Sequence, residues 1–138
     1  MDNNLRCIVV TPERSVLDQT ADFVAVPMYD GELGVLPGRS PLIGRLGAGE
    51  LRMMQGGHPH RYFVDGGFVQ IRSNMVTVLT PKAIPAEEID AKAAERDLQT
   101  AQAKLTTTKE EQEIQFKAQA RARAMLRVAR HRHGPDFE

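Results

Sequence analysis

Four histidines and one cysteine are the side chains in this sequence best suited to metal binding or nucleophilic chemistry. The histidines form two pairs, His58 with His60 and His131 with His133, and alternate residues of a strand can face the same way. No third ligand follows at a metal-site spacing, and the single Cys7 allows neither a structural zinc cluster nor an intrachain disulfide. No nucleophile elbow or histidine-centred triad is present. The sequence therefore predicts no metal site, no cofactor and no catalytic activity of the chain alone.

A glycine-rich stretch at residues 30–40 is the segment that most resembles a phosphate-binding loop. Its Gly34 and Gly38 have three residues between them, whereas a Walker loop has four. Arg39 stands in place of the loop's lysine, and Pro41 stands where the helix of such a loop should continue. These departures argue against nucleotide binding at this stretch.

Charged residues are unevenly distributed, although the total charge of the 138 residues is zero. Residues 85–113 carry eight acids against four cations, a net charge of −4, whereas residues 114–133 carry six cations and no acid. The cationic stretch should be attracted to an acidic partner surface. A nucleic acid is an alternative partner, but the chain lacks the aromatic stacking residues and the overall basic charge of such binders. We expect a protein partner and no nucleic acid.

Residues 1–84 have the pattern of a mainly β domain. Seven strand-length apolar runs recur about every ten residues, which favours a sandwich or barrel over alternating βαβ units. Turn chemistry separates many of them, as Asp-Gly, Gly-Gly, Asp-Gly-Gly and Ser-Asn at residues 30–31, 56–57, 65–67 and 73–74. The apolar runs are residues 5–10, 22–26, 33–36, 51–54, 61–64, 68–71 and 75–79.

The pattern becomes helical over residues 85–138, where Ala, Glu, Gln, Lys and Arg dominate. Pro85 suits the first position of a helix, and acids at positions 87 and 88 suit the positive end of its dipole. We therefore predict a first helix from Pro85 to Leu105.

A second helix is predicted to begin after a run of three threonines. Thr108, followed three residues later by Glu111, is a capping-box signal for a helix over about 109–130. The two helices should form an antiparallel hairpin. No apolar run approaches the roughly 18 residues that a membrane span requires.

The seam of this hairpin is mostly alanine at helical spacing. Each buried methyl contributes only about 0.8 kcal/mol, so the two helices should be weakly held. A competing surface could then displace the hairpin, although a permanently docked hairpin is the alternative. The predicted seam residues are Ala94, Leu98, Ala101 and Leu105 with Ala118, Ala122, Met125 and Ala129.

Several ordered motifs resemble the epsilon subunit of the F-type ATP synthase, the subunit called delta in mitochondria. They are residues 9–14, residues 31–38 with 40–42, residues 65–69 and residues 76–79. The block Gly-Glu-Leu-Gly-x-x-Pro-Gly at residues 31–38 is the most specific of them. The resemblance extends over nearly the whole chain and implies a β-sandwich followed by a two-helix hairpin.

The resemblance implies a non-catalytic rotor subunit of the central stalk that couples ion translocation to ATP synthesis. Its expected partners are the gamma subunit, the c-ring, and the alpha and beta subunits. Its expected location is the cytoplasmic face of the bacterial inner membrane, as a peripheral component. In this family the hairpin can leave the sandwich, extend along gamma and suppress ATP hydrolysis.

The resemblance also implies partner contacts for individual residues. Glu32 matches the family's position near the c-ring loops, and Arg39 stands at the gamma-facing position where the family usually has histidine. The charges that would face an acidic segment of the catalytic subunits are Arg121, Arg123, Arg127 and Arg130.

Some members of this family bind ATP in the folded hairpin. Their motif is Ile/Leu-Asp-x-x-Arg-Ala, and here residues 89–94 keep the Ile, Asp90 and the final Ala but have alanine in place of the arginine. Arg123 and Arg127 match the motif's second-helix positions. An ATP-sensing binding module, with ATP as a regulatory ligand, is therefore the alternative function.

Overall fold

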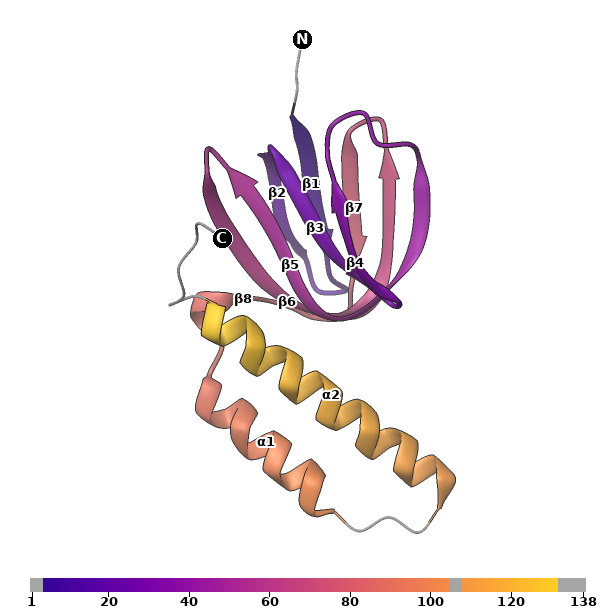
Figure 1. Ribbon diagram of the computed structural model, residues 1–138, viewed down its shortest axis with the longest axis vertical. Coiled ribbons are helices and arrows are strands. Elements are labelled where there is room, and N and C mark those ends of the chain that lie inside the picture. Colours follow the sequence, from indigo (N-terminus) through magenta and orange to yellow (C-terminus); the bar gives the residue numbers. More distant parts are fainter. Residues whose placement is uncertain (1–3, 105–107, 132–138) are drawn as a thin grey trace.

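The protein is described by a computed structural model over residues 4–104 and 108–131. Strands form a strongly curved β-sandwich, and two antiparallel helices lie against one end of it (Figure 1). The predicted fold class, a β-sandwich followed by a helical hairpin, is confirmed.

The sandwich is built from one sheet that curls into two layers. The strand order is β2-β1-β7-β6-β5-β3-β4, with β8 paired to β6. All pairs are antiparallel except β1 with β7. The strands are β1 (Leu5–Val10), β2 (Ser15–Ala21), β3 (Phe23–Met28), β4 (Gly31–Val35), β5 (Leu42–Gln55), β6 (His58–Arg72), β7 (Met75–Leu79) and β8 (Ala83–Pro85).

Aliphatic side chains fill the space between the layers, because alternate residues of each strand point inward. Cys7 lies fully buried among them, and burial, with a smaller effect of the Asp18 charge, raises the pKa of its thiol to about 12. The largest fully buried members are Leu5, Val9, Val24, Val26, Val35, Leu51, Met53, Val64, Val69, Ile71 and Val76.

The predicted turn at residues 65–67 is wrong. Strand β6 continues through these residues and pairs with β5 along most of its length, so two predicted strands are one. The glycines instead bend the strand: Gly66 and Gly67 have φ of 79° and 110°, and a Cβ on Gly67 would lie 1.9 Å from the Leu79 carbonyl oxygen. Long strands β5 and β6 thereby pass from one layer into the other (Figure 1).

Two other predicted turns are confirmed. Gly56–Gly57 joins β5 to β6, and Ser73–Asn74 joins β6 to β7, each with two positive φ values. The turn before β4 lies at residues 29–30, one position earlier than predicted. Strands β2 and β8 lie outside the predicted apolar runs, because β2 has four polar residues among its seven and β8 is only three residues long.

The prediction that the first helix begins at Pro85 is wrong. Pro85 ends strand β8 opposite Tyr62, and the two acids that follow lie in a short 3-10 turn, η1 (Ala86–Glu88). Helix α1 (Ala91–Ala103) begins after Asp90, whose Oδ1 accepts a hydrogen bond from the Ala93 amide at 3.1 Å. An aspartate side chain satisfies a free helix amide, which proline cannot do.

The second helix, α2 (Lys109–His131), begins where the sequence predicts. The Thr108 hydroxyl accepts a hydrogen bond from the Glu111 amide at 3.1 Å and donates one to the Glu111 carboxylate, also at 3.1 Å. This is the expected capping contact.

Candidate partner-binding surfaces

The seam between α1 and α2 is close to the predicted one. Four alanines of the predicted set are buried, at positions 94, 101, 122 and 129. Leu98, Ala118 and Met125 are half-buried, and Leu105 lies outside the described residues. The buried part of the predicted seam therefore consists of alanines, which bury little area each.

Helix α2 has a second buried face that the sequence reading missed. Ala124 and Val128 pack against Phe63 of β6 and against Ala86 and Ile89, which lie between β8 and α1. The sequence contains a signal for this face, because Ala124 and Val128 are four residues apart and so lie on one side of the helix, next to the seam positions. This face attaches the hairpin to the sandwich.

A salt bridge joins the middle of α2 to the bend of β6. Arg121 Nε donates a hydrogen bond to Asp65 Oδ1 at 2.9 Å. The Asp65 side chain is 20% exposed and that of Arg121 is 45% exposed. Arg121, a predicted partner contact, is thus engaged by the chain's own sandwich.

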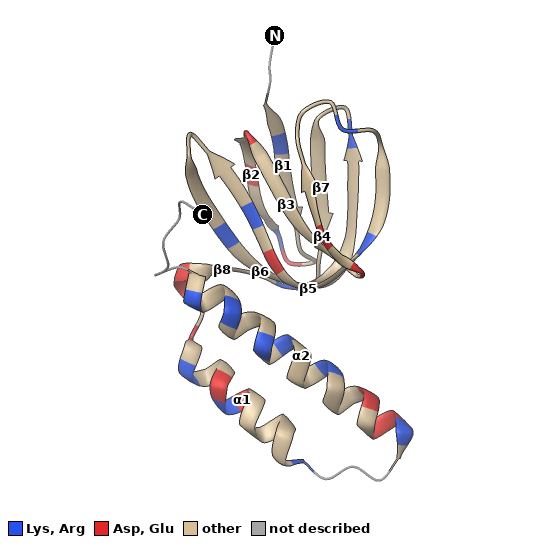
Figure 2. Ribbon diagram, viewed as in Figure 1, with Lys and Arg blue, Asp and Glu red and all other residues tan. Residues whose placement is uncertain are grey.

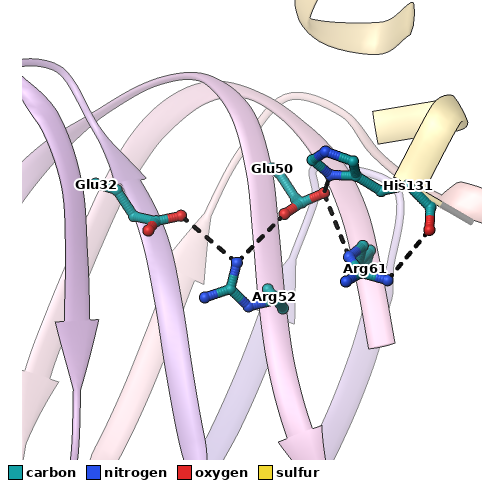
Figure 3. A network of polar contacts seen from close by, with 5 residues as sticks. All are labelled: Glu32, Glu50, Arg52, Arg61 and His131. Carbon is teal, nitrogen blue, oxygen red and sulfur yellow. Dashed lines mark hydrogen bonds and ion pairs between the residues drawn. The ribbon is translucent and has the colours of Figure 1, made fainter. Parts of the chain in front are cut away.

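A polar network holds the C-terminal end of α2 (Figure 3). Glu50 of β5, whose side chain is 13% exposed, contacts Nδ1 of His131 and lies 3.6 Å from Arg61 Nε. Arg61 also donates a hydrogen bond to the His131 backbone carbonyl at 3.3 Å. Carbonyls at a helix C-terminus carry partial negative charge, so this guanidinium is well placed.

Glu32 lies at the outer end of the same network. Its carboxylate is 3.9 Å from Arg52 Nη1, which is 3.7 Å from the Glu50 carboxylate (Figure 3). The Glu32 side chain is more than half exposed on edge strand β4. An exposed ion pair of this kind is weakly held. A partner can therefore reach Glu32, a predicted contact residue, directly.

Three other predicted arginines point into solvent from the docked α2. Arg123, Arg127 and Arg130 are exposed, and cations are concentrated along this helix (Figure 2). Within residues 4–104 and 108–131, Arg127 and Arg130 have no hydrogen bond or ion pair, and Arg123 Nη2 has one long contact, 3.5 Å, to Gln119. Their charges are available to a partner while the hairpin is docked.

The predicted nucleotide residues lie at one end of the hairpin. Ile89, directly before Asp90, packs in the same buried cluster as Val128, one position beyond Arg127. Asp90 uses a carboxylate oxygen to cap α1, and Arg123 lies one turn before Arg127 on α2. The fold brings Asp90 to the end of α2 that carries Arg127.

Arg39 lies in the loop after β4, half-buried. Its amide donates a hydrogen bond to the Leu36 carbonyl at 3.2 Å, and the preceding Gly38 amide donates to Asn74 Oδ1 at 2.7 Å. The loop is thus tied to the Ser73–Asn74 turn.

Exposed apolar side chains lie on the outside of β5, β6 and β7, with Gln70 and Thr77 between them, and the sequence did not identify them. Ile43, Phe68, Met75 and Leu79, which we call the outer face, are 74%, 57%, 37% and 52% exposed. Register places Phe68 opposite Leu79. A shallow groove of about 420 Å³ runs beside them, lined by residues that include Val10, Pro12 and Pro81. The sequence signal for this face was the presence of adjacent apolar residues in the run 68–71. A strand in which apolar and polar residues strictly alternate would have one polar face.

The described part of the chain has no group of three or more His, Cys, Asp or Glu residues that could hold a metal ion. Neither of its helices is long and apolar enough to cross a membrane.

Comparison with known proteins gives concordant results. The family model for the β-sandwich domain of the ATP synthase delta/epsilon chain matches residues 4–86. The ATP synthase epsilon chain of Rhodopirellula baltica is 51% identical over 127 residues, covering 92% of this chain and 99% of the relative. That of Nitratidesulfovibrio vulgaris strain DP4 is 37% identical over 129 residues, covering 94% and 92%.

Two solved structures share the fold. A chain of the Euglena gracilis mitochondrial ATP synthase OSCP/F1/c-ring structure aligns with a TM-score of 0.73 at 21% identity, over 94% of this chain and 79% of that one. A chain of the Tetrahymena thermophila central stalk/c-ring structure aligns with a TM-score of 0.71 at 12% identity, over 91% and 96%.

Proposed function

The chain belongs to the delta/epsilon family of ATP synthase subunits, and on that premise we propose that it is a rotor subunit of the central stalk whose hairpin restrains ATP hydrolysis. In this role it couples ion translocation to ATP synthesis without a catalytic site of its own. It works as a peripheral component on the cytoplasmic face of the bacterial inner membrane.

Two surfaces of the sandwich suit two stalk partners. The outer face has four exposed apolar side chains, which suits a protein interface, and we assign it to the gamma subunit together with the Arg39 loop. Glu32 is exposed on an edge strand, and we assign it to the loops of the c-ring. Both solved structures that share the fold belong to assemblies with a c-ring, and this supports the assignment.

The observation that carries the inhibitory role is the division of α2 into a docked face and a cationic face. Small side chains and a few polar contacts hold one face to the sandwich. Arg123, Arg127 and Arg130 stand exposed beyond it. A weakly held helix with unpaired cations can move to an acidic surface of the alpha and beta subunits when that surface offers more favourable contacts.

The test is the ATP hydrolysis rate of a catalytic head depleted of this subunit, with full-length variants added back. One variant has glutamine at positions 123, 127 and 130. The matched control replaces three cations of the first helical segment, Lys92, Arg96 and Lys104, by glutamine, so both lose three charges. Binding of each variant to the head is measured in parallel.

We expect the wild-type chain and the control to slow hydrolysis equally, and the triple variant of α2 to bind while slowing it several-fold less. Equal inhibition by all three chains would remove the role assigned to these arginines. Binding without inhibition by the wild-type chain would leave a stalk subunit with no restraining function.

A regulatory ATP site in the hairpin is a second candidate. The observation in its favour is the placement of Asp90 at the end of α2 that carries Arg127. Its test is a calorimetric titration of the full chain and of its Asp90→Asn and Arg123→Ala variants with ATP.

A further inference from the structure

Arg121 differs from the other arginines of α2 in its surroundings. Its guanidinium is hydrogen-bonded to the Asp65 carboxylate at 2.9 Å, whereas Arg127 and Arg130 have no such partner in the described part of the chain. We propose that the Asp65–Arg121 pair is the contact that controls release of the hairpin. The ion pair between Arg121 and Asp65 must break before Arg121 can bind an acidic partner surface.

Asp65 is held rigidly in place for this contact. Its amide donates to the Lys82 carbonyl at 3.1 Å and to the Thr80 hydroxyl at 3.3 Å, and Thr80 is itself buried. Gly66 and Gly67 follow in the left-handed conformation that bends β6. Because the backbone is fixed on both sides, little backbone entropy is lost when the carboxylate meets Arg121.

The two carboxylates that contact α2, Glu50 and Asp65, also differ in how many cations lie near them. Glu50, at the far end of α2, lies near two sandwich arginines, Arg52 and Arg61, which stay beside it when the hairpin leaves. Within the described residues Asp65 pairs with one cation, Arg121. Undocking therefore separates Asp65 from the one cation that it contacts within the described residues, whereas Glu50 keeps two cations nearby.

The apolar contact of α2 with the sandwich is too small to make this ion pair unimportant. From α2 it has the buried side chains Ala124, Val128 and Ala129 and the half-buried Met125, which pack with Phe63, Ala86 and Ile89 and with the partly buried Ala48 and Ile84. A modest change in docking free energy therefore changes the population of released hairpins by a measurable factor.

This inference rests on the proposed function only in that hairpin release matters to the assembled enzyme. The contact itself is tested on the isolated full-length chain by amide hydrogen exchange of α2, which reports opening of the helix from the sandwich. The variant is Asp65→Asn, which keeps the shape and an acceptor oxygen and removes the charge. The control is Asp18→Asn, which breaks a comparable ion pair with Arg6 on strands β1 and β2, at 2.7 Å.

We expect Asp65→Asn to speed exchange of the amides around residues 118–128 about threefold to fivefold, as for a half-exposed ion pair, and Asp18→Asn to leave them unchanged. Arg121→Gln should match Asp65→Asn, and the double variant should exchange no faster than either single one. Equal exchange in Asp65→Asn and wild type, or full additivity in the double variant, would overturn the proposal.

The same variants separate this inference from the proposed function. Added to the depleted catalytic head, Asp65→Asn should slow hydrolysis more than the wild-type chain, because Arg121 remains and is easier to release. If the wild-type chain does not inhibit at all, the inhibitory function fails while the exchange result still decides the role of the pair. If the wild-type chain inhibits and Asp65→Asn inhibits no more strongly, the pair does not control release.

Discussion

Arg61 of β6 donates a hydrogen bond to the backbone carbonyl of His131, the last residue of α2, across 70 positions of the sequence. The same guanidinium lies 3.6 Å from Glu50, which also contacts the His131 ring. The sandwich thus supplies both a donor for the helix end and a carboxylate for its last side chain. The end of α2 is therefore fixed by polar groups in addition to the apolar contacts of Val128 and Ala129.

Replacing Arg61 by glutamine should loosen the last turn of α2. The substitution removes the charge beside the helix C-terminus, so we expect amide exchange of residues 128–131 to rise about threefold to tenfold. The matched control is Arg52→Gln, because Arg52 contacts Glu50 and Glu32 but not α2. Similar exchange in both variants would show that the network holds the sandwich and not the helix.

Replacing Gly67 by alanine should destabilise the sandwich strongly. Its Cβ would lie 1.9 Å from the Leu79 carbonyl oxygen, and the residue has φ of 110°. We expect a loss of at least about 3 kcal/mol in the free energy of unfolding, measured by denaturant titration.

Gly57→Ala is the matched control. Gly57 also has positive φ, 82°, but nothing lies within 4 Å of the added Cβ. It should cost only the conformational term, about 1–2 kcal/mol. Equal losses in the two variants would mean that the close approach of β6 to β7 is not what requires Gly67.

The two-part fold could be predicted from sequence because its signals are local. The Thr108–Glu111 cap and the paired turn residues at 56–57 and 73–74 each determine a few backbone torsions and hydrogen bonds. The error at residues 65–67 arose because Asp-Gly-Gly also suits a bend within a long strand. Pairing with β5 and β7, which is a long-range property, decided between them.

Site residues were predictable only as far as charge and motif position allow. The cationic character of α2 was evident, but the difference between Arg121 and its neighbours was not, since it depends on Asp65 lying 56 positions away. The sequence itself predicts only a turn at Asp65. Likewise the outer face depends on the register that puts Phe68 beside Leu79.

The thiol of Cys7 should make the fold less stable in alkali. Its pKa in the folded chain is about 12, against 9.0 when exposed, mainly because of burial. Between these values the unfolded chain has lost the proton and the folded chain keeps it, so stability is full below about pH 9 and falls as the pH rises toward about 12. Denaturant titrations at several pH values in this window measure the slope.

Cys7→Ala provides the comparison for this slope. Burial also raises the pKa of Tyr62, but that residue is present in both chains, so the difference between their slopes belongs to Cys7. We expect a shallower fall for the variant. Parallel pH profiles would show that the thiol is not protected by the fold.

Replacing Phe68 by serine should weaken binding to the gamma subunit with little effect on folding. The side chain is 57% exposed in the outer face, so its removal leaves no core cavity. We expect gamma affinity to fall by about tenfold, measured by titration of the full chain against an alpha-beta-gamma head. Phe116→Ser, at a similarly exposed phenylalanine of α2, should leave that affinity within about twofold.

Asp90 offers a way to separate helix capping from nucleotide binding. Its Oδ1 accepts from the Ala93 amide at 3.1 Å, and asparagine caps helices about as well as aspartate. Asp90→Ala should therefore speed amide exchange in the first turn of α1 by about fivefold, a cap energy of about 1 kcal/mol, whereas Asp90→Asn should not.

The proposed ATP site predicts a different effect of substitutions at Asp90. If the hairpin holds ATP through Asp90, Arg123 and Arg127, loss of the carboxylate charge alone should change ATP affinity, and Arg123→Ala should weaken it, in calorimetric titrations of the full chain. In Asp90→Asn, unchanged amide exchange in α1 together with an altered ATP affinity would support the ATP site, because a purely structural role of Asp90 does not predict both results. Unchanged affinity in Asp90→Asn and in Arg123→Ala would leave Asp90 as a helix cap.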